Sequence, residues 1–481
     1  MATDVRARRA TAPLRSSAGP DRKRAARVAD LIVEDVMALG WPVGAVLGHE
    51  AALLERYGVS RAVYREAVRL VENQQVARTR RGPGGGLVIT EPTVDAVTEA
   101  VVLYLHRVDA RLDEVVEARL VLEDMATRLA AERLDDDDEP VLQGFTHETE
   151  TDLSDARALH LVVARASKNP ALELFVDVLD EAAKLYSRRW KSVAKAVTAE
   201  TAHAHAQIAE AVLAGDPDLA ARRMRKHLEA EAAYMHRRHA TRQLLPDGVV
   251  LGDASDAKLA DTVARHITHY LVAAELQPGD LVGTEPELME REAVSRAVLR
   301  EAVRLLEHRG IARMRRGPGG GLYVVAPSPY AVTDVAAIYL ARRGISLADL
   351  AEMRLGVEIA LVRMASERAD AQVLEEMRAA LDREAESTRE ERAEVLHDLH
   401  AAVAKAAGSR ALELVALVLI RLCRLYQIER LPMSRLKQID MEIRRAHSGI
   451  ARAIEAGEAP AAERRMRRHL AALGAVMRAG G

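Results

Sequence analysis

Apolar residues recur every three or four positions in two separate stretches of the 481-residue chain, 60–71 and 295–306. This spacing predicts amphipathic helices that bury one face. Ser60 and Ser295 stand where a helix begins, and a serine there accepts a hydrogen bond from an amide of the first turn. A shorter helix is predicted before each serine, over 51–57 and 286–291, so each pair has the spacing of a helix-turn-helix.

Each of these helices is followed by a pattern typical of a β-hairpin. Short strand-like runs at 76–80 and 86–90 flank a Gly-Pro-rich turn, and runs at 311–315 and 321–325 repeat the arrangement. Glycine has no Cβ, so a turn of this kind lets the backbone approach a ligand closely. A P-loop is excluded, because no Gly-Lys-Ser/Thr sequence follows the turn.

The remaining stretches, 93–238 and 329–478, show long helical periodicity with few helix-breaking residues. We therefore expect a mainly α protein, in which two winged helix-turn-helix domains with small β-hairpin wings alternate with two all-α helical bundles. Thr284 and Glu287 form a capping-box pattern at the start of one short helix.

The alternation reflects an internal repeat. Residues 60–89 and 295–324 are identical at 21 of 30 positions, with a constant offset of 235. The similarity continues through the helical stretches at offsets of 240 and 242, so the chain is a duplicated two-domain unit. The expected organisation is a disordered basic tail (1–24), a first winged helix (25–91), a first helical domain (92–239), a linker (240–256), a second winged helix (257–327) and a second helical domain (328–481).

Composition and charge narrow the choice of partners. One cysteine excludes an internal disulfide framework, and the N-terminus lacks the apolar core of a secretory signal, so we expect a cytoplasmic protein that does not enter a membrane. Aromatic residues make up only 3%, which argues against stacking on single-stranded bases. The net charge is −3, yet seven arginines against two glutamates fall in 56–82 and eight against three in 291–317. Positive charge is thus concentrated in the two predicted DNA readers.

The sequences VSRAVYREAVRLVE and VSRAVLREAVRLLE resemble the recognition-helix signature of the GntR family of bacterial transcription regulators. The resemblance implies that arginines early in each helix contact bases and phosphates of a double-stranded DNA operator, while the wing-tip glycines enter the minor groove. One departure is Ala293, which replaces the turn glycine Gly58. The expected DNA-binding residues are Ser60, Arg61, Arg65, Arg69, Arg80, Arg81, Gly84, Gly85, Ser295, Arg296, Arg300, Arg304, Arg315, Arg316, Gly319 and Gly320.

The helical stretches resemble the FCD effector domain of the FadR subfamily of that family. In many FCD domains, histidines at three matching positions hold a divalent metal, for which zinc is a suitable ion. The usual aspartate or asparagine four residues before the first histidine is replaced by Ala156 and Leu396. His397 is a candidate fourth ligand in the second copy. The expected metal ligands are His160, His205 and His227, and then His400, His447 and His469.

The resemblance also implies that Arg119 and Arg354 bind the effector. A guanidinium group facing a metal in a helical cavity suits a small carboxylate, because the two groups pair through two parallel hydrogen bonds. The alternative is a salt bridge to the glutamate one helical turn on, Glu123 or Glu358. Both interpretations remain open at this stage.

These features favour a ligand-responsive transcription regulator over two alternatives. A metal-dependent hydrolase would explain the histidines, but no general-base carboxylate stands in the motifs around them, so we expect no enzyme. A nucleoid-type protein that binds DNA by charge alone would not need effector domains. Because one chain carries two readers, we expect either a monomeric pseudo-dimer on a short palindrome or a homodimer.

Overall fold

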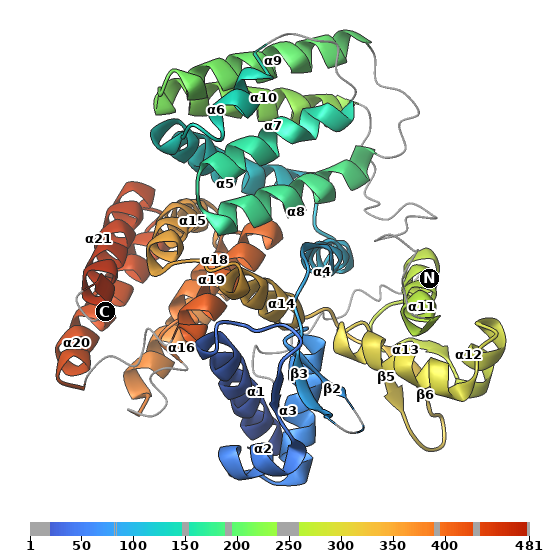
Figure 1. Ribbon diagram of the computed structural model, residues 1–481. Coiled ribbons are helices and arrows are strands. Elements are labelled where there is room, and N and C mark those ends of the chain that lie inside the picture. The colour runs from blue at the N-terminus through green and yellow to red at the C-terminus, as the bar shows by residue number, and fades with distance from the viewer. Residues whose placement is uncertain are drawn as a thin grey trace, which may run out of the picture. The chain divides into compact units, whose positions relative to one another are not determined.

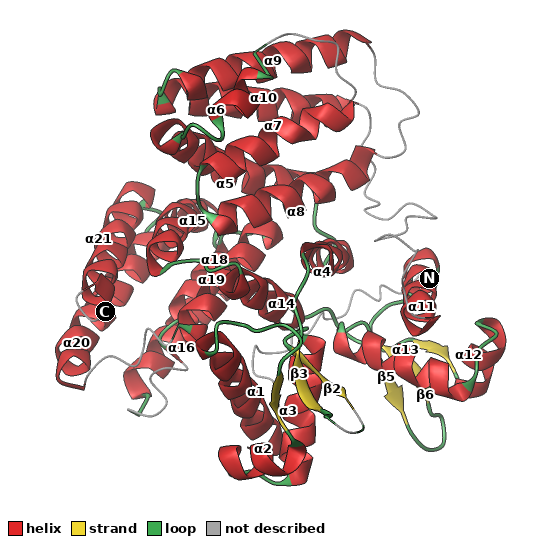
Figure 2. Ribbon diagram, viewed as in Figure 1, coloured by secondary structure: helices red, strands yellow, loops and turns green. Residues whose placement is uncertain are grey.

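The computed structural model describes residues 20–80, 82, 84–146, 153–187, 195–237, 259–388, 395–426 and 433–478 (Figure 1). Within these ranges the chain is mainly helical, with two small three-stranded antiparallel sheets (Figure 2), which confirms the expected fold class. Its contacts divide it into two units, Met1–Glu91 and Pro92–Gly481, and each is described by itself. Across the described ranges, no helix is both long enough and apolar enough to cross a membrane.

Parts of the predicted organisation lie outside the described residues. These parts are the linker 240–256, residues 1–19 of the predicted basic tail, and Arg81 at the tip of the first hairpin. The first helix begins at Pro20, inside the segment that we assigned to the tail.

The first unit is a winged helix. Ser60 caps the helix Arg61–Asn73 as expected, since its Oγ accepts a hydrogen bond from the Val63 amide at 3.4 Å. The predicted hairpin forms, and a three-residue strand that the sequence pattern did not predict pairs with its inner strand to give the order β1-β3-β2. In chain order the elements are α1 (Pro20–Ala38), β1 (Val46–Gly48), α2 (Glu50–Tyr57), α3 (Arg61–Asn73), β2 (Ala77–Arg80) and β3 (Gly86–Ile89).

The second unit contains another winged helix of the same topology, with the sheet order β4-β6-β5. The predicted capping box is present, because Glu287 accepts from the Thr284 amide at 2.8 Å. Ala293 takes the left-handed backbone conformation of its counterpart Gly58, with φ of +51° against +60°. The elements are α11 (Leu259–Ala273), β4 (Leu281–Gly283), α12 (Glu285–Arg291), α13 (Arg296–His308), β5 (Ala312–Arg315) and β6 (Gly321–Val324).

The first helical domain surrounds the 22-residue helix α5, which packs against α7, α8, α9 and α10. Its acidic run, 135–139, leads into the five-residue helix α6. The elements are α4 (Val94–Arg107), α5 (Leu112–Arg133), α6 (Glu139–Gln143), α7 (Leu153–Ala166), α8 (Pro170–Ser187), α9 (Lys195–Leu213) and α10 (Pro217–Arg237).

The second helical domain repeats this plan around α15, which packs against α18, α19, α20 and α21. It differs from the first domain at α16, a 16-residue helix where the first domain has only α6. The elements are α14 (Pro329–Arg342), α15 (Leu347–Arg368), α16 (Ala371–Glu386), α18 (Asp398–Ala406), α19 (Arg410–Leu425), α20 (Met433–Glu455) and α21 (Ala459–Arg478).

Helix α4 of the first helical domain also completes the second winged helix. Leu103 belongs to the same buried apolar cluster as residues of α11, α13 and β6. The Arg107 guanidinium donates hydrogen bonds to the carbonyls of Gly310, at 2.7 Å, and of Val325. Nearby, Arg309 pairs with Glu99 of α4 at 2.8 Å. The second reader is therefore attached to the first helical domain by packing, hydrogen bonds and charge.

Candidate functional site

The predicted arginine row of the first reader lies on one exposed face of α3. The side chains of Arg61, Arg65 and Arg69 are 77%, 67% and 69% exposed. Val63, Ala67 and Val71 lie on the buried face of the same helix. Glu50 of α2 stands 3.8 Å from Arg61 and 3.9 Å from Arg65, and ion pairs this exposed contribute little to stability. The guanidinium groups are thus accessible to a further anion.

The second reader presents the same row on α13. Arg296, Arg300 and Arg304 are 64%, 68% and 72% exposed. Glu285, the counterpart of Glu50, lies 3.3 Å from Arg296 and 3.5 Å from Arg300. The duplication has preserved the exposed arginines, the glutamate that faces the first two of them, and the glutamate that pairs with the third, Glu66 with Arg69 and Glu301 with Arg304, both at 2.9 Å.

The wing tips are tight glycine turns edged by arginines. Gly84 and Gly319 both have φ of +70°, in the left-handed region that favours glycine. A Cβ on Gly320 would lie 2.7 Å from the Gly317 carbonyl oxygen, so that position also requires glycine. Arg80 donates to the Gly84 carbonyl at 2.8 Å, whereas Arg315 lies over the Tyr323 ring at 4.2 Å. Gly85 and Arg316 lie in the same two turns, next to these residues.

Three helices of each helical domain bring the predicted histidines together. His160 of α7, His205 of α9 and His227 of α10 are buried, with ring nitrogens within 4.8 Å of one another. The Nε2 atoms of His205 and His160 each lie 3.2 Å from Nε2 of His227. In the second domain, His400 of α18, His447 of α20 and His469 of α21 form the matching group, with 3.2 Å between Nε2 of His447 and His469.

Buried glutamates orient these imidazoles. Glu123 of α5 accepts a hydrogen bond from Nδ1 of His160, and Glu358 of α15 accepts one from Nδ1 of His400. In the second domain Glu384 also accepts from His447 Nδ1, at 2.9 Å. When Nδ1 carries the proton, the Nε2 lone pair is free to bind a cation. Histidine and carboxylate are arranged in this way around many protein-bound metals.

The geometry fits a divalent ion such as zinc. Zn–N bonds are about 2.0–2.1 Å long, so two nitrogens of a tetrahedral site lie about 3.3 Å apart, close to the 3.2 Å between the Nε2 atoms. Burial, and then the charge of His160, lowers the pKa of His205 to about 3. Burial also lowers the pKa of His227 and His469 well below the usual value. These groups are therefore neutral at pH 7, which is the form that binds metal.

His160 and His400 differ in their protonation. Burial alone would lower the pKa of His160, but the Glu123 carboxylate raises it above its usual value. For His400 the effect of burial is the larger one, and its pKa is lowered. A metal at the first site consequently competes with a proton on His160.

A fourth protein ligand is not evident in either group of described residues. At the position four residues before the first histidine, Leu396 cannot bind a metal, and the side chain of Ala156 is not among those that the structure describes. His397 is buried, and its ring centroid is 6.1 Å from that of His400. It is not among the three residues whose ring nitrogens lie within 4.8 Å of one another.

The buried arginine beside each histidine group makes the salt bridge that the sequence left as an alternative. Arg119 Nε donates to Glu123 at 2.7 Å, and Arg354 Nε donates to Glu358 at 2.6 Å. Burial opposes ionisation of Glu123, but Arg119 and His160 lower its pKa to about 2. The glutamate therefore joins the arginine and the histidine into one network, a role that our sequence analysis did not assign.

The two arginines have different further partners. Arg119 also faces Glu231 at 2.9 Å and Asp180 at 3.6 Å, so three carboxylates surround it. At the matching positions the second domain has Leu473 and Ile420, and the side chain of Cys423 hydrogen-bonds Arg354. Both arginines are almost fully buried. Arg119 and Glu231 line a small surface depression together with Val116, Leu228, Ala232 and Met235.

Comparisons with known proteins agree with this architecture. The chain matches the family described as "FCD domain" over residues 114–230 and 349–472, together half of its length. It matches the family described as "Bacterial regulatory proteins, gntR family" over residues 259–324.

Proteins similar to this chain include the HTH-type transcriptional regulator YcbG of Bacillus subtilis. It is 32% identical over 158 residues, which make up 32% of this chain and 64% of YcbG. The HTH-type transcriptional regulator Rv0494 of Mycobacterium tuberculosis is 29% identical over 232 residues, covering 45% of this chain and 91% of Rv0494. The chain thus spans less than two thirds of the length of YcbG.

Among solved structures, Streptococcus agalactiae GntR is 22% identical and covers 45% of this chain and 99% of its own, with a TM-score of 0.34. E. coli McbR/YncC is 16% identical and covers 46% of this chain and 98% of its own, with a TM-score of 0.25. From the two FCD matches and the gntR match, this chain belongs to the GntR family of bacterial regulatory proteins that carry FCD domains.

Proposed function

We propose that the chain is a DNA-binding transcription regulator that responds to a small molecule. The observation that carries the proposal is the pair of exposed arginine rows on α3 and α13, each flanked by a glycine-rich wing. A helix with such a row enters the major groove in helix-turn-helix proteins, and the wing reaches an adjacent groove or phosphate. The names of YcbG and Rv0494 as HTH-type transcriptional regulators support the same function.

The DNA-binding part is tested with the full chain and a random-sequence duplex library. Selected duplexes are titrated by fluorescence anisotropy, at several salt concentrations, against scrambled duplexes of equal length. We expect selected duplexes to bind at least 100-fold more tightly than scrambled ones. Equal affinity for all sequences would reject a sequence-specific regulator.

Two pairs of substitutions assign the binding to the readers. Arg61→Ala with Arg65→Ala, or Arg296→Ala with Arg300→Ala, should each weaken specific binding at least tenfold, because each lost base contact costs about 1–3 kcal/mol. Arg222→Ala is the matched control, since Arg222 is an exposed arginine on α10 in the first effector domain. An equal loss from the control would assign the effect to overall charge.

We further propose that each histidine group holds one divalent metal. Metal analysis of the full chain after dialysis against zinc should give two ions per chain, and His205→Ala or His447→Ala should each remove one. His203→Ala is the control, because His203 lies on the exposed side of α9. An unchanged zinc content in either variant would remove that site from the proposal.

The effector is proposed to be a small carboxylate that pairs with Arg354 in the second domain. Support comes from the charges around the two arginines, since Arg119 already faces three carboxylates and Arg354 faces one. Succinate and benzoate serve as probes, with the melting temperature and DNA affinity as readouts. Arg354→Met should abolish both responses and Arg119→Met should retain them. The opposite pattern would assign the response to the first domain.

In this proposal one chain acts as a pseudo-dimer, because it supplies two readers and two effector domains. Sedimentation of the full chain with a selected duplex should give a complex of one chain per palindrome. A mass equal to two chains would replace the pseudo-dimer with a homodimer.

A further inference from the structure

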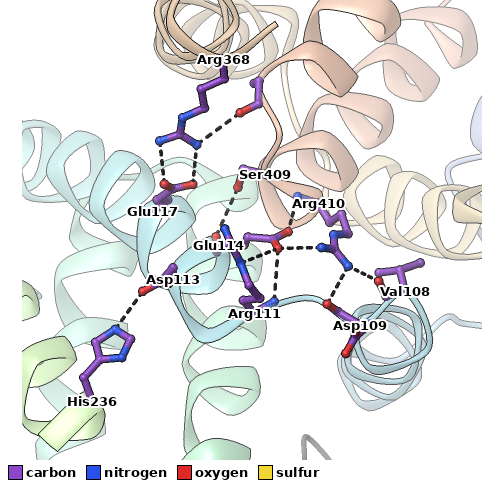
Figure 3. Close-up of polar contacts among 11 residues, drawn as sticks. Val108, Asp109, Arg111, Asp113, Glu114, Glu117, His236, Arg368, Ser409 and Arg410 are labelled. Carbon is purple, nitrogen blue, oxygen red and sulfur yellow. Dashed lines mark hydrogen bonds and ion pairs between the residues drawn. The ribbon is translucent and has the colours of Figure 1, made fainter. Parts of the chain in front are cut away.

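The interface between the two effector domains joins matching residues in both directions. Arg133 of α5 pairs with Glu352 of α15. The counterparts Arg368 and Glu117 pair at 2.8 Å, and Figure 3 shows this second pair. Each residue of one pair lies 235 positions from its counterpart in the other pair. Such reciprocal contacts are the signature of a twofold interface, here formed between two halves of one chain.

The first departure from this symmetry is steric. A Cβ added to Gly356 of α15 would lie 2.1 Å from Sδ of Met125 and 2.4 Å from its Cε. Met125 of the first half therefore fills the space that the glycine of the second half leaves open. The counterparts of these two residues are Val121 and Ala360, so the filled space occurs on one side of the pseudo-twofold axis.

The second departure concerns a buried carboxylate. Glu114 of α5 accepts a hydrogen bond from the Arg410 amide at 2.9 Å and pairs with the Arg410 guanidinium at 3.0 Å (Figure 3). The same guanidinium donates to the carbonyls of Val108 and of Asp109. The counterpart of Arg410 in the first half is Pro170, which has neither a guanidinium nor an amide hydrogen.

We propose that this interface selects one first-half and one second-half effector domain and disfavours two identical halves. The surface of each half thus fits one partner, the other half of this chain. The proposal rests on the pseudo-dimer part of the proposed function and adds to it the residues that exclude other pairings.

Pairing of two first halves is disfavoured on both sides of the axis. Val121 would stand where Gly356 stands, so its Cβ would overlap the present position of the partner's Met125 thioether. Pro170 would face Glu114, which is 1% exposed, and would supply neither of the two donors that Arg410 provides. Glu114 would keep only the Arg111 amide, at 3.3 Å, and the Arg111 guanidinium, at 3.5 Å, and a buried carboxylate that loses donors is destabilised.

Pairing of two second halves is disfavoured by lost packing. Ala360 would stand in place of Met125 opposite Gly356, leaving unfilled the space that the methionine occupies. Arg410 would face Asp349, the counterpart of Glu114, which is one methylene shorter and whose carboxylate already accepts from the Ser346 amide at 2.9 Å and the Ser346 hydroxyl at 2.6 Å. The interface is complete only when the two halves differ.

The direct test uses full chain that carries a protease site within 240–256 and is cut after purification. Uniformly 15N-labelled and unlabelled samples are mixed, and the pairs are counted by native mass spectrometry after exchange. We expect first halves to be paired with second halves in more than nine of ten complexes. A statistical mixture, in which half of the pairs are homotypic, would overturn the selectivity. The mass of uncut chain tests the pseudo-dimer separately.

A second test keeps the chain uncut. Alanine normally stabilises a helix relative to glycine. The control Gly449→Ala on α20 should therefore raise the melting temperature, because the atoms nearest to its Cβ would belong to the flexible Arg465 side chain, at 3.7 Å and beyond. Gly356→Ala should instead lower the melting temperature by a few degrees, and in a Met125→Ala background it should raise it as the control does. An equal rise for Gly356→Ala and Gly449→Ala in the unmodified chain would contradict the proposed fit.

Discussion

The two effector domains carry the same buried arginine in different electrostatic surroundings. In the first domain Arg119 stands among Glu123, Asp180 and Glu231. In the second, Arg354 has one carboxylate partner, Glu358, and a thiol neighbour. Burial opposes the charge of Arg119, but its three acidic neighbours hold its pKa above the usual value. Gene duplication has thus preserved the arginine, while two of the carboxylates around it, Asp180 and Glu231, have the apolar counterparts Ile420 and Leu473.

This difference bears on what each site can accept. Three carboxylates around one guanidinium leave excess negative charge, which a divalent cation on the histidines offsets and a further anion would increase. In the second site Glu358 balances the charge of Arg354, and the one further carboxylate, Glu384 at His447, would be more than offset by a divalent cation, which leaves room for an anionic effector. A charge buried this deeply is stable only beside a charge of opposite sign. The different numbers of carboxylates around Arg119 and Arg354 should therefore change the free energy of binding an anion.

The largest effect should come from removing each arginine in turn. Arg119→Met leaves three carboxylates without their cation and should cost about 4–5 kcal/mol of the free energy of unfolding, whereas Arg354→Met leaves one and should cost about 3 kcal/mol. Urea unfolding of metal-free protein measures both. Equal losses would mean that Asp180 and Glu231 are not coupled to Arg119.

Removing the metal should reveal a second difference in stability between the two histidine sites. At a zinc concentration 100 times the Kd, binding adds about 2.7 kcal/mol to stability, so chelation should lower the melting temperature. Because a proton competes for His160, the loss on lowering the pH to 6 should be greater for a chain that retains only the first site (His447→Ala) than for one that retains only the second (His205→Ala). The reverse order would contradict the contrast between His160 and His400.

Glu413, which lies near the interface between the two effector domains, should make the stability of the chain depend on pH. Burial raises the pKa of Glu413 to about 7, although Lys405 and Arg410 oppose the shift and Glu114 and Glu376 reinforce it. A raised carboxyl pKa means that the folded chain binds the proton more tightly, so stability is lost as the pH rises from about 4.5 to 7. The loss should be up to about 3 kcal/mol.

Glu413→Gln should remove that part of the pH dependence. Its first-half counterpart Glu173 pairs with Arg343 at 2.8 Å, and Glu173→Gln is the matched control. Urea unfolding at pH 5 and pH 8 makes the measurement. If the free energy of unfolding of Glu413→Gln depends on pH as it does in the unmodified chain, the Glu413 carboxyl is hydrated in solution.

The smallest effect concerns the turns of the two readers. Ala293 has φ of +51°, where a Cβ is strained, and Gly58 has φ of +60°. Ala293→Gly should stabilise the second reader by about 1 kcal/mol, and Gly58→Ala should destabilise the first by a similar amount. Hydrogen exchange of each reader reports these changes. A destabilised Ala293→Gly reader would mean that the alanine methyl packs against its neighbours.

Local sequence signals predicted much of this molecule. Ser60 was identified as a helix start from its residue type and Thr284 from its capping-box spacing with Glu287, and the three histidines of each domain came together as the resemblance implied. The strands Val46–Gly48 and Leu281–Gly283 were missed, because three residues are too few to show alternation. Their pairing depends on a hairpin about 40 residues away.

The contacts of the site that the sequence did not predict also join residues that are far apart in the chain. Glu384 meets His447 across 63 positions, and Glu231 meets Arg119 across 112, so no local spacing indicates either contact. An alignment of the two halves could have indicated that the acidic residues Asp180 and Glu231 have apolar counterparts. Such a comparison identifies differences in charge but not which groups touch.

The docking of α4 on the second reader has a consequence for biosynthesis. Leu103 and Arg107 are translated about 150 to 220 residues before the strands and helices that they stabilise. Contacts this distant in sequence slow folding, yet here the earlier partner already exists when the later one emerges. The first effector domain therefore supplies a ready-made template on which the second winged helix completes its core.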